Sequence, residues 1–212
     1  MSITTWNPSD ISASVTLSGS NKIATCTATN QGARSLNGKS AGKWYAEFSN
    51  CLFSSVPALS SRGGVGVADS TYSLTTGPQS DNTHSAWVQR DEISVGNGTR
   101  SAAAIAFPIT TSTVIGVALD QSGALIWFTT DGATWNNGGT ANPATGVGGY
   151  SLAGAATLGP NAFLAAWLRW NGGPNDAATL NGGDTAFSFS IPSGFLAWNP
   201  IVHYPSQVIV LW

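Results

Sequence analysis

Two short apolar runs on either side of a polar turn form the clearest pattern in the chain, within residues 112–132. In the first run, IGVALD, large apolar residues alternate with small ones, and the second run, LIWF, is rich in β-branched and aromatic residues. Alternation with a period of two is typical of a strand with one buried face. Between the runs, Gln121-Ser122-Gly123 fits a three-residue loop whose glycine adopts a left-handed backbone. The pattern predicts a β-hairpin at the centre of a β-sandwich.

Similar short patterns recur along the chain and predict further strands. They lie at residues 15–17, 22–28, 43–50, 65–67, 85–89, 93–95 and 163–170. In residues 43–50, Trp44, Ala46 and Phe48 share one face, while Tyr45 and Glu47 share the other. No segment has a convincing helical period, and at most one turn is expected near Ala102–Ala106. These patterns predict an all-β, antiparallel sandwich.

The same patterns predict which residues form the core and which segments are loops. The predicted core consists of Trp44, Phe48, Val65, Val67, Ile115, Val117, Leu119, Leu125, Trp127, Phe187 and Phe189. Polar or glycine-rich segments predict loops at Gly32–Gly42, Cys51–Gly63, Thr71–Thr83, Asp131–Gly149 and Asn171–Asp184.

Four stretches of the chain resemble the SPRY (B30.2-like) family, and they occur in the family's order. They are GKWYAEF at residues 42–48, GVGVA at 64–68, IGVALDQSGALIWFTTDG at 115–132, and FSF at 187–189 followed by PSGF at 192–195. The resemblance covers residues 5–199 and implies the concanavalin-like jelly roll of SPRY domains, with residues 187–189 in its closing strand. It also implies a recognition surface at one end of the sandwich, formed by Thr71–Thr83, Asp131–Gly149 and Asn171–Asp184. Glycine-rich, charge-poor versions of this domain occur in phage and prophage proteins, which this chain resembles more than the eukaryotic ones.

Composition limits the classes of partner. The 212 residues suit one domain, here residues 1–199 followed by an extended tail at 200–212. Only 8% of residues are charged, which indicates a protein held in an assembly or working outside the cytosol. The net charge of −2 argues against nucleic acid as a partner. No secretory signal and no membrane-inserted segment is expected.

Cys26 and Cys51 are the only cysteines, and two interpretations of them stay open. Each lies near a predicted strand, so that a disulfide between them is conceivable. Alternatively, both are buried thiols that pack as small hydrophobic residues. Their spacing fits no zinc motif, and the sequence predicts neither a metal nor a cofactor.

The residue types that catalysis requires do not form a recognisable constellation. His84 and His203 match no hydrolase or metalloprotease motif, and solvated side chains are expected for both. Glu47 and Glu92 are the only glutamates, and their spacing does not place two carboxylates on one strand face. They are expected to be solvated or hydrogen-bonded on their strands. The sequence predicts no catalytic residues and hence no enzyme.

Nine tryptophans favour a binding surface, because an indole offers stacking area to a sugar or a peptide. Trp44, Trp127 and Trp167 are expected in the core, while Trp87, Trp135, Trp170 and Trp198 lie near predicted strand ends or in loops. The candidate ligand site is Trp135 with its polar neighbours Asp131, Asn136 and Asn137. Core packing is the alternative for Trp135.

The last residues of the chain are the candidate assembly segment. The segment Val208, Ile209, Val210, Leu211 and Trp212 is strand-like and has no charged side chain, so we expect it to be covered. It either pairs with its own sandwich or docks on a neighbouring subunit.

The leading hypothesis is a non-enzymatic phage virion protein, in a tail, fibre, collar or capsid decoration. Its partners would be other virion proteins or its own copies, and a host-surface glycan. The alternatives are an intracellular protein-interaction module and, third, a glycan-cleaving enzyme.

Overall fold

The computed structural model describes residues 3–53, 63–75, 83–90, 92–96, 99–101, 109–136, 139–154, 158–169 and 175–199. The strands are β1 (Trp6–Ile11), β2 (Val15–Ser18), β3 (Ile23–Cys26), β4 (Gln31–Ser35), β5 (Lys43–Leu52), β6 (Gly64–Ala68), β7 (Ser85–Gln89), β8 (Ile93–Val95), β9 (Thr99–Ser101), β10 (Ile115–Asp120), β11 (Leu125–Thr129), β12 (Tyr150–Ser151), β13 (Phe163–Leu168), β14 (Ala177–Asn181) and β15 (Leu196–Ala197). A single turn of 3-10 helix, η2, covers Pro143–Thr145. The described part of the chain has no helix long and apolar enough to cross a membrane.

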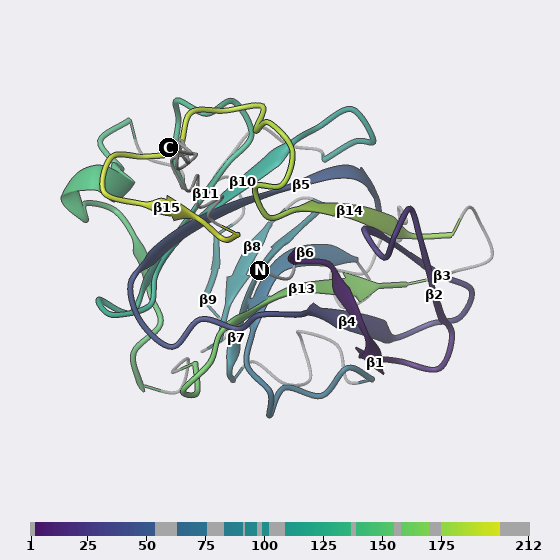
Figure 1. Cartoon of the computed structure of the whole chain (residues 1–212). Helices are drawn as coiled ribbons and strands as arrows, with labels where there is room; N and C mark the ends of the chain where they lie inside the picture. The colour runs from purple at the N-terminus through teal and green to yellow at the C-terminus, as the bar shows by residue number, and fades with distance from the viewer. Residues whose placement is uncertain are drawn as a thin grey trace, which may run out of the picture.

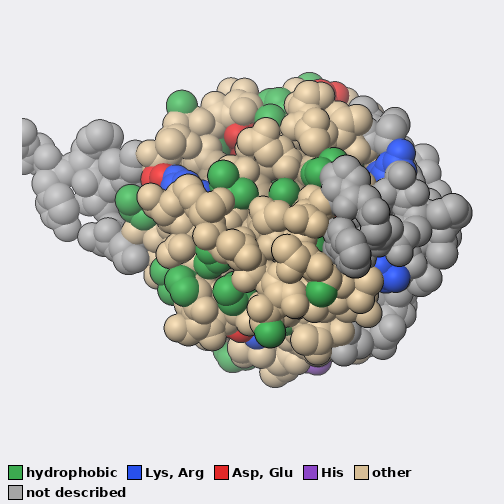
Figure 2. Space-filling view, turned by 90° about the vertical axis from the view of Figure 1, so that its right-hand side faces the viewer, with side chains coloured by type: hydrophobic (Ala, Val, Ile, Leu, Met, Phe, Trp, Pro, Cys, Tyr) green, Lys and Arg blue, Asp and Glu red, His purple; other side chains and the backbone are tan. Residues whose placement is uncertain are grey.

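The strands form two sheets that pack face to face (Figure 1). One sheet has the order β1-β4-β13-β6-β7-β8-β9, and the other has β12-β11-β10-β5-β14-β3-β2 with β15 paired to β5. All pairs are antiparallel except β15 with β5. The predicted all-β, antiparallel sandwich is therefore confirmed. Figure 2 shows one face of it, where charged side chains are few among uncharged polar groups and backbone.

The main core lies between the two sheets, and alternation along each strand decides which side chains enter it. Phe48, Val65, Val67, Ile115, Val117 and Leu119 are all fully buried there, as predicted. Trp127 is also buried, but on the outer face of its sheet, in a second cluster with Tyr45, Ala118, Trp135 and Phe195. Contrary to the prediction, Trp44, Leu125 and Phe187 are only partly buried and pack against these clusters, and Phe189 is also only partly buried and belongs to neither cluster.

The predicted central hairpin is confirmed, although its turn differs from the prediction. Strands β10 and β11 pair from Gly116–Thr129 to Asp120–Leu125. The left-handed residue is Ala124, with φ of 51°, and not Gly123. Gly123 serves another purpose, because its N–H donates to the Asp120 carboxylate at 2.7 Å and a Cβ there would lie 2.7 Å from Oδ2 of Asp120. The glycine is needed for close approach of this carboxylate, not for its backbone angle.

Two segments predicted as loops contain sheet strands instead. Residues 31–35, in a stretch predicted to be turn-rich, form β4 between β1 and β13. Residues 177–181, predicted as part of a rim loop, form β14 between β5 and β3. Residues 187–189, in contrast, form no strand, and the closing strand is β15. The expected turn at residues 102–106 lies outside the described residues, as do the assembly residues 208–212.

Both cysteines are free and buried, so the structure favours the thiol interpretation over the disulfide. Cys26 ends β3 and Cys51 lies near the end of β5, and β14 runs between these two strands. Two strand spacings separate the cysteines by about 9–10 Å, which is too far for a disulfide. Burial raises the pKa of Cys26 to about 11 and raises that of Cys51 further.

We expect neither thiol to react with an aromatic disulfide reagent at pH 8 in the native protein. At a pKa near 11 only about one Cys26 thiol in a thousand is ionised, and the thiolate is the reactive form. After unfolding in guanidinium without reductant, both cysteines should react. If no thiol reacted after unfolding, the two cysteines would have formed a disulfide and the prediction would be wrong.

Candidate recognition rim

The three loops predicted to share one end of the sandwich do not do so. Phe163 at the start of β13 pairs with Ala68, whereas Trp167 near its end pairs with Gly64. The loop that begins at Asp69 therefore lies at one end of the sheet, and the loop after β13 lies at the other. The connection that begins at Asp131 starts at the second end, because Thr129 pairs with Gly116 at the start of β10. A single surface composed of these three loops is excluded by this register.

Of the two interpretations of Trp135, the structure confirms core packing and contradicts the exposed indole. Only 6% of Trp135 is exposed, and its ring packs edge-on against Tyr45. Asn136 is also buried, where its side chain donates to the carbonyls of Ile126 and Gly148 and accepts from the N–H of Phe128. Asp131 is exposed, but its carboxylate accepts from the N–H groups of the turn that follows. Asn137 lies outside the described residues.

The other tryptophans near strand ends are not a stacking surface either. Trp87 lies within β7 and Trp198 directly follows β15, and both are fully buried. Trp170 lies outside the described residues. Trp167 is buried as predicted, while Trp44 is only half-buried. The half-buried Trp44 is the one described tryptophan that reaches the surface.

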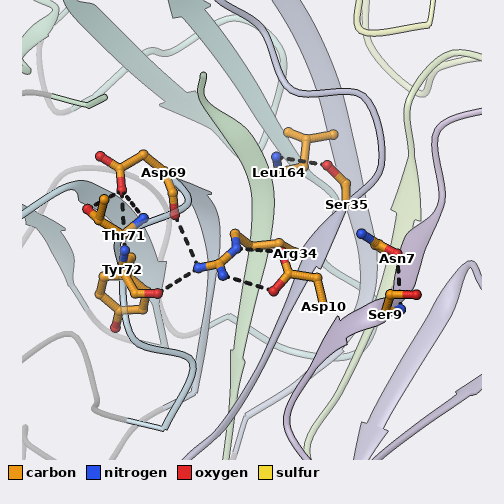
Figure 3. A network of polar contacts seen from close by, with 9 residues as sticks. All are labelled: Asn7, Ser9, Asp10, Arg34, Ser35, Asp69, Thr71, Tyr72 and Leu164. Atoms are coloured by element: carbon orange, nitrogen blue, oxygen red, sulfur yellow. Dashed lines mark hydrogen bonds and ion pairs between the residues drawn. The ribbon is translucent and has the colours of Figure 1, made fainter. Parts of the chain in front are cut away.

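The structure instead brings together polar side chains around Asp69, which directly follows β6 (Figure 3). Its Oδ1 accepts from the N–H and the hydroxyl of Thr71, each at 2.7 Å, and from the N–H of Tyr72. Its Oδ2 accepts from the N–H of Gly159 at 2.6 Å and lies 2.8 Å from Nδ1 of His84. The carboxylate thus ties three separate segments of the chain together.

Arg34, in β4, also binds the loop that begins at Asp69. Its guanidinium makes a bidentate pair with Asp10, with two contacts of 2.8 Å, and it is almost fully buried. The remaining nitrogen donates to the carbonyls of Asp69 and Tyr72 (Figure 3). A planar guanidinium is suited to this arrangement, because its donors diverge at fixed angles.

Further hydrogen bonds join four loops into one surface, which we call the Asp69 rim: residues 36–42, 69–75, 121–124 and 158–162. Gly159 donates to Asp69, and its carbonyl accepts from the side chain of Gln121. Ser122 accepts from the N–H of Gly42, and Lys39 forms a backbone bridge with Ala162. The Asp69 rim is therefore a cross-linked surface rather than four independent loops.

Sequence reasoning missed this network because its members are far apart in the chain. Arg34 fell in a stretch predicted to be a turn, and His84 was expected to be solvated. The side chain of His84 is 40% exposed, but it also contacts Asp69, and its backbone is left-handed with φ of 63°. The Asp69-Ser70-Thr71 sequence directly after a strand is a recognisable signal for a side-chain-capped turn. That signal predicts the local turn but not Arg34 or Gly159.

The two glutamates do not lie on one strand face, because they come from different sheets. Glu47 lies in β5, while Glu92 precedes β8 in the other sheet. The Glu47 carboxylate accepts from the hydroxyl of Tyr45 and from the N–H groups of Ser188 and Phe189. Its contacts hold residues 188–189 against the outer face of β5. Among the described residues, no three His, Cys, Asp or Glu side chains are grouped so as to hold a metal ion.

Asp69→Asn should lower the free energy of unfolding at pH 7 by about 1–3 kcal/mol, because an amide cannot accept all the bonds of the carboxylate. Burial raises the pKa of Asp69, but the bonds from Thr71 and Gly159 and the nearby His84 outweigh it, so that its pKa is lowered. A lowered pKa gives stability that is present above the unfolded pKa and lost as pH falls through the folded one.

Urea unfolding between pH 7 and pH 3 checks this expectation. The wild type should lose more stability than Asp69→Asn as the pH falls below about 4, because the variant lacks the titrating group. Equal losses for the two proteins would show that Asp69 does not couple folding to pH.

Comparisons with solved structures relate the whole sandwich to SPRY domains. The SPRY domain of human HERC1 aligns with a TM-score of 0.57 at 10% identity, over 85% of this chain and 99% of that one. The PSpry domain of TRIM65 aligns with a TM-score of 0.55 at 16% identity, over 84% and 89%. Stonustoxin aligns at 0.54 and 16%, over 84% of this chain and 27% of its own. No protein-family model matches the chain, and no curated protein matches its sequence. The chain therefore has the fold of a SPRY domain.

Proposed function

We propose that the chain is a non-enzymatic protein-binding module that works as a structural component of a phage virion. The observation that carries this proposal is the SPRY fold combined with a surface that is unusually poor in charge. Such a surface offers few long-range charges for steering or repulsion, and it suits contacts that stay in place within an assembly.

The hydrogen-bonding of the polar side chains supports binding rather than catalysis. Two of the buried carboxylates, those of Glu47 and Asp69, accept several hydrogen bonds from the protein itself. A general acid or base must reach the substrate through such an oxygen. Glu47 instead holds residues 188–189 against β5, and Asp69 holds the loops of the Asp69 rim together. The module then recognises its partner by shape and by the residues that the rim presents.

A second candidate is an interaction module that works outside any particle, inside the cell that produces it. The observation that favours it is the structural likeness to the SPRY domains of HERC1 and TRIM65. Glycan attachment through Trp135 is not part of our proposal, because a buried indole offers no stacking face.

Particles purified from cells that encode the chain separate the two candidates. The virion role predicts that the chain copurifies with particles in a fixed ratio to their other proteins. It also predicts that specific antibodies label one part of the particle in electron micrographs. A chain that stays in the soluble fraction and binds one cellular protein would instead support the second candidate and overturn the first.

A further inference from the structure

The half-buried Trp44 lies beside Lys39, in the loop 36–42 of the Asp69 rim, and pairs with the exposed Leu196. Trp44 lies at the start of β5 and pairs in parallel register with Leu196 of β15. Lys39 comes from the loop 36–42, and its Nζ lies 3.9 Å from the centroid of the Trp44 ring. We call Lys39, Trp44 and Leu196 the lysine–leucine patch.

The charge of Lys39 is not neutralised within the described residues, unlike that of the other two lysines. Lys22 pairs with Asp184, and Lys43 lies 3.5 Å from Asp120. Lys39 contacts the ring of Trp44 and, at 5.9 Å, that of Trp198, and no carboxylate of the described part lies within ion-pair distance of it. Its half-buried position lowers the pKa of its ammonium by desolvation. A carboxylate brought to this position would therefore gain a partly desolvated cation as its partner.

Leu196 supplies the apolar half of the patch. It is 55% exposed, although its neighbour Phe195 is buried against Trp127. Exposure of a single leucine is common, but here the leucine pairs with Trp44, whose ring the cation of Lys39 covers. Trp44 itself is not available for stacking on a sugar, because Lys39 covers one face of its ring and its Nε1 already donates to the Ala41 carbonyl at 2.6 Å. The patch thus offers an ammonium donor and an aliphatic side chain, each next to Trp44.

We infer that the lysine–leucine patch is a docking site for an acidic segment of a partner protein. In this complex a carboxylate of the partner accepts from Nζ of Lys39, and an aliphatic side chain of the same segment packs on Leu196 and the edge of Trp44. The partner segment should therefore contain Asp or Glu close in sequence to Leu, Ile or Val. This inference rests on the proposed function as a protein-binding module and names the chemistry of its partner.

Short synthetic peptides and the full chain test the docking site. The probes pair one Glu with one Leu at varied spacing in a Gly/Ser background, and each has a matched copy in which Gln replaces Glu. A heparin-derived oligosaccharide is the non-peptide probe. Binding is measured for the wild type, for Lys39→Gln and for Leu196→Ser. Lys22→Gln is the control, because it removes an equal charge where Asp184 already neutralises the lysine. Thermal melting verifies that each variant folds.

We expect the wild type and Lys22→Gln to bind Glu–Leu peptides at least about tenfold more tightly than their Gln copies, as for a charge-assisted hydrogen bond. Lys39→Gln should lose this preference, and Leu196→Ser should weaken binding of both peptide sets. High salt should reduce the preference for Glu.

Four outcomes would overturn the inference: no binding of any peptide, equal binding of both peptide sets, a Glu preference that survives Lys39→Gln, or Lys39-dependent binding of the oligosaccharide alone. The particle experiment above does not depend on Lys39. If the chain were found in particles but did not bind these peptides, only the docking site would be refuted, and the proposed function would stand.

Discussion

Val117→Asp is expected to lower the free energy of unfolding by about 4 kcal/mol or more, which is enough to unfold many single domains at room temperature. Val117 is 1% exposed in the middle of β10, and it faces the main core. A carboxylate there would lose its hydration among apolar side chains without any partner. The variant should therefore melt far below the wild type or fail to fold.

Val147→Asp is the matched control, because it makes the same chemical change at a valine that is 48% exposed. Its side chain lies at the surface, so that its stability should stay within about 0.5 kcal/mol of the wild type. Thermal melting and urea unfolding of both variants give the comparison. If Val117→Asp melted within a degree or two of the wild type, Val117 would not belong to the core.

Gly66→Ala should be almost as damaging, although it adds only a methyl group. Gly66 pairs with Trp87 in the neighbouring strand, and a Cβ built on it would lie 2.0 Å from the carbonyl oxygen of Ala86. Backbone of a central strand cannot move away as a flexible side chain could. We therefore expect β6 and β7 to separate locally, with a loss of about 3 kcal/mol or more.

Gly139→Ala makes the same change where a Cβ would meet no atom within 4 Å. Its effect on the free energy of unfolding should be within about 0.5–1 kcal/mol, because only the entropy of the unfolded chain changes. Amide hydrogen exchange of the wild type and Gly66→Ala then locates the damage. Unchanged protection of Val65 and Val88 in the Gly66 variant would contradict the expected separation of the two strands.

The parts of the fold that the sequence predicted well are those with a strong local pattern. Residues 115–120 alternate regularly, residues 125–128 are a run of aliphatic and aromatic side chains, and together they form the β10–β11 hairpin. Residues 43–50 likewise place Ala46 and Phe48 in the main core and Tyr45 on the opposite face. In both cases the buried face can be identified from neighbouring residues alone.

The strands that sequence reasoning missed are composed of small and polar residues. In β14, Ala178 and Leu180 are buried, but Thr179 and Asn181 on the opposite face are typical of loops. In β4, burial includes Arg34 and Ser35, which have no apolar signal. Both strands lie between two others, so that their backbone groups are satisfied by neighbours distant in sequence. Such tertiary pairing overrides weak local preference.

Pattern analysis also could not decide where the polar and aromatic groups of the candidate site would lie. Trp135 and Asn136 have the composition of an exposed sugar site, yet the connection after β11 folds back over the sheet and buries both. Lys39 and Leu196 are separated by more than half the chain and gave no signal. Both lie next to Trp44, Lys39 over its ring and Leu196 as its partner in the parallel pairing of β15 with β5.

By itself, the sequence determined that this protein is a charge-poor, all-β sandwich with its central hairpin at residues 115–129, because period-two alternation and charge content are local properties of the chain. Only the tertiary structure decided that Asp69, Arg34 and Gly159 cross-link one rim, that Trp135 is buried, and that Lys39 and Leu196 both lie next to Trp44. Each of these depends on which strands are neighbours and in what register. The pairing and register of the strands are determined cooperatively, by burial and hydrogen bonding across both sheets. No short segment of the sequence determines them alone.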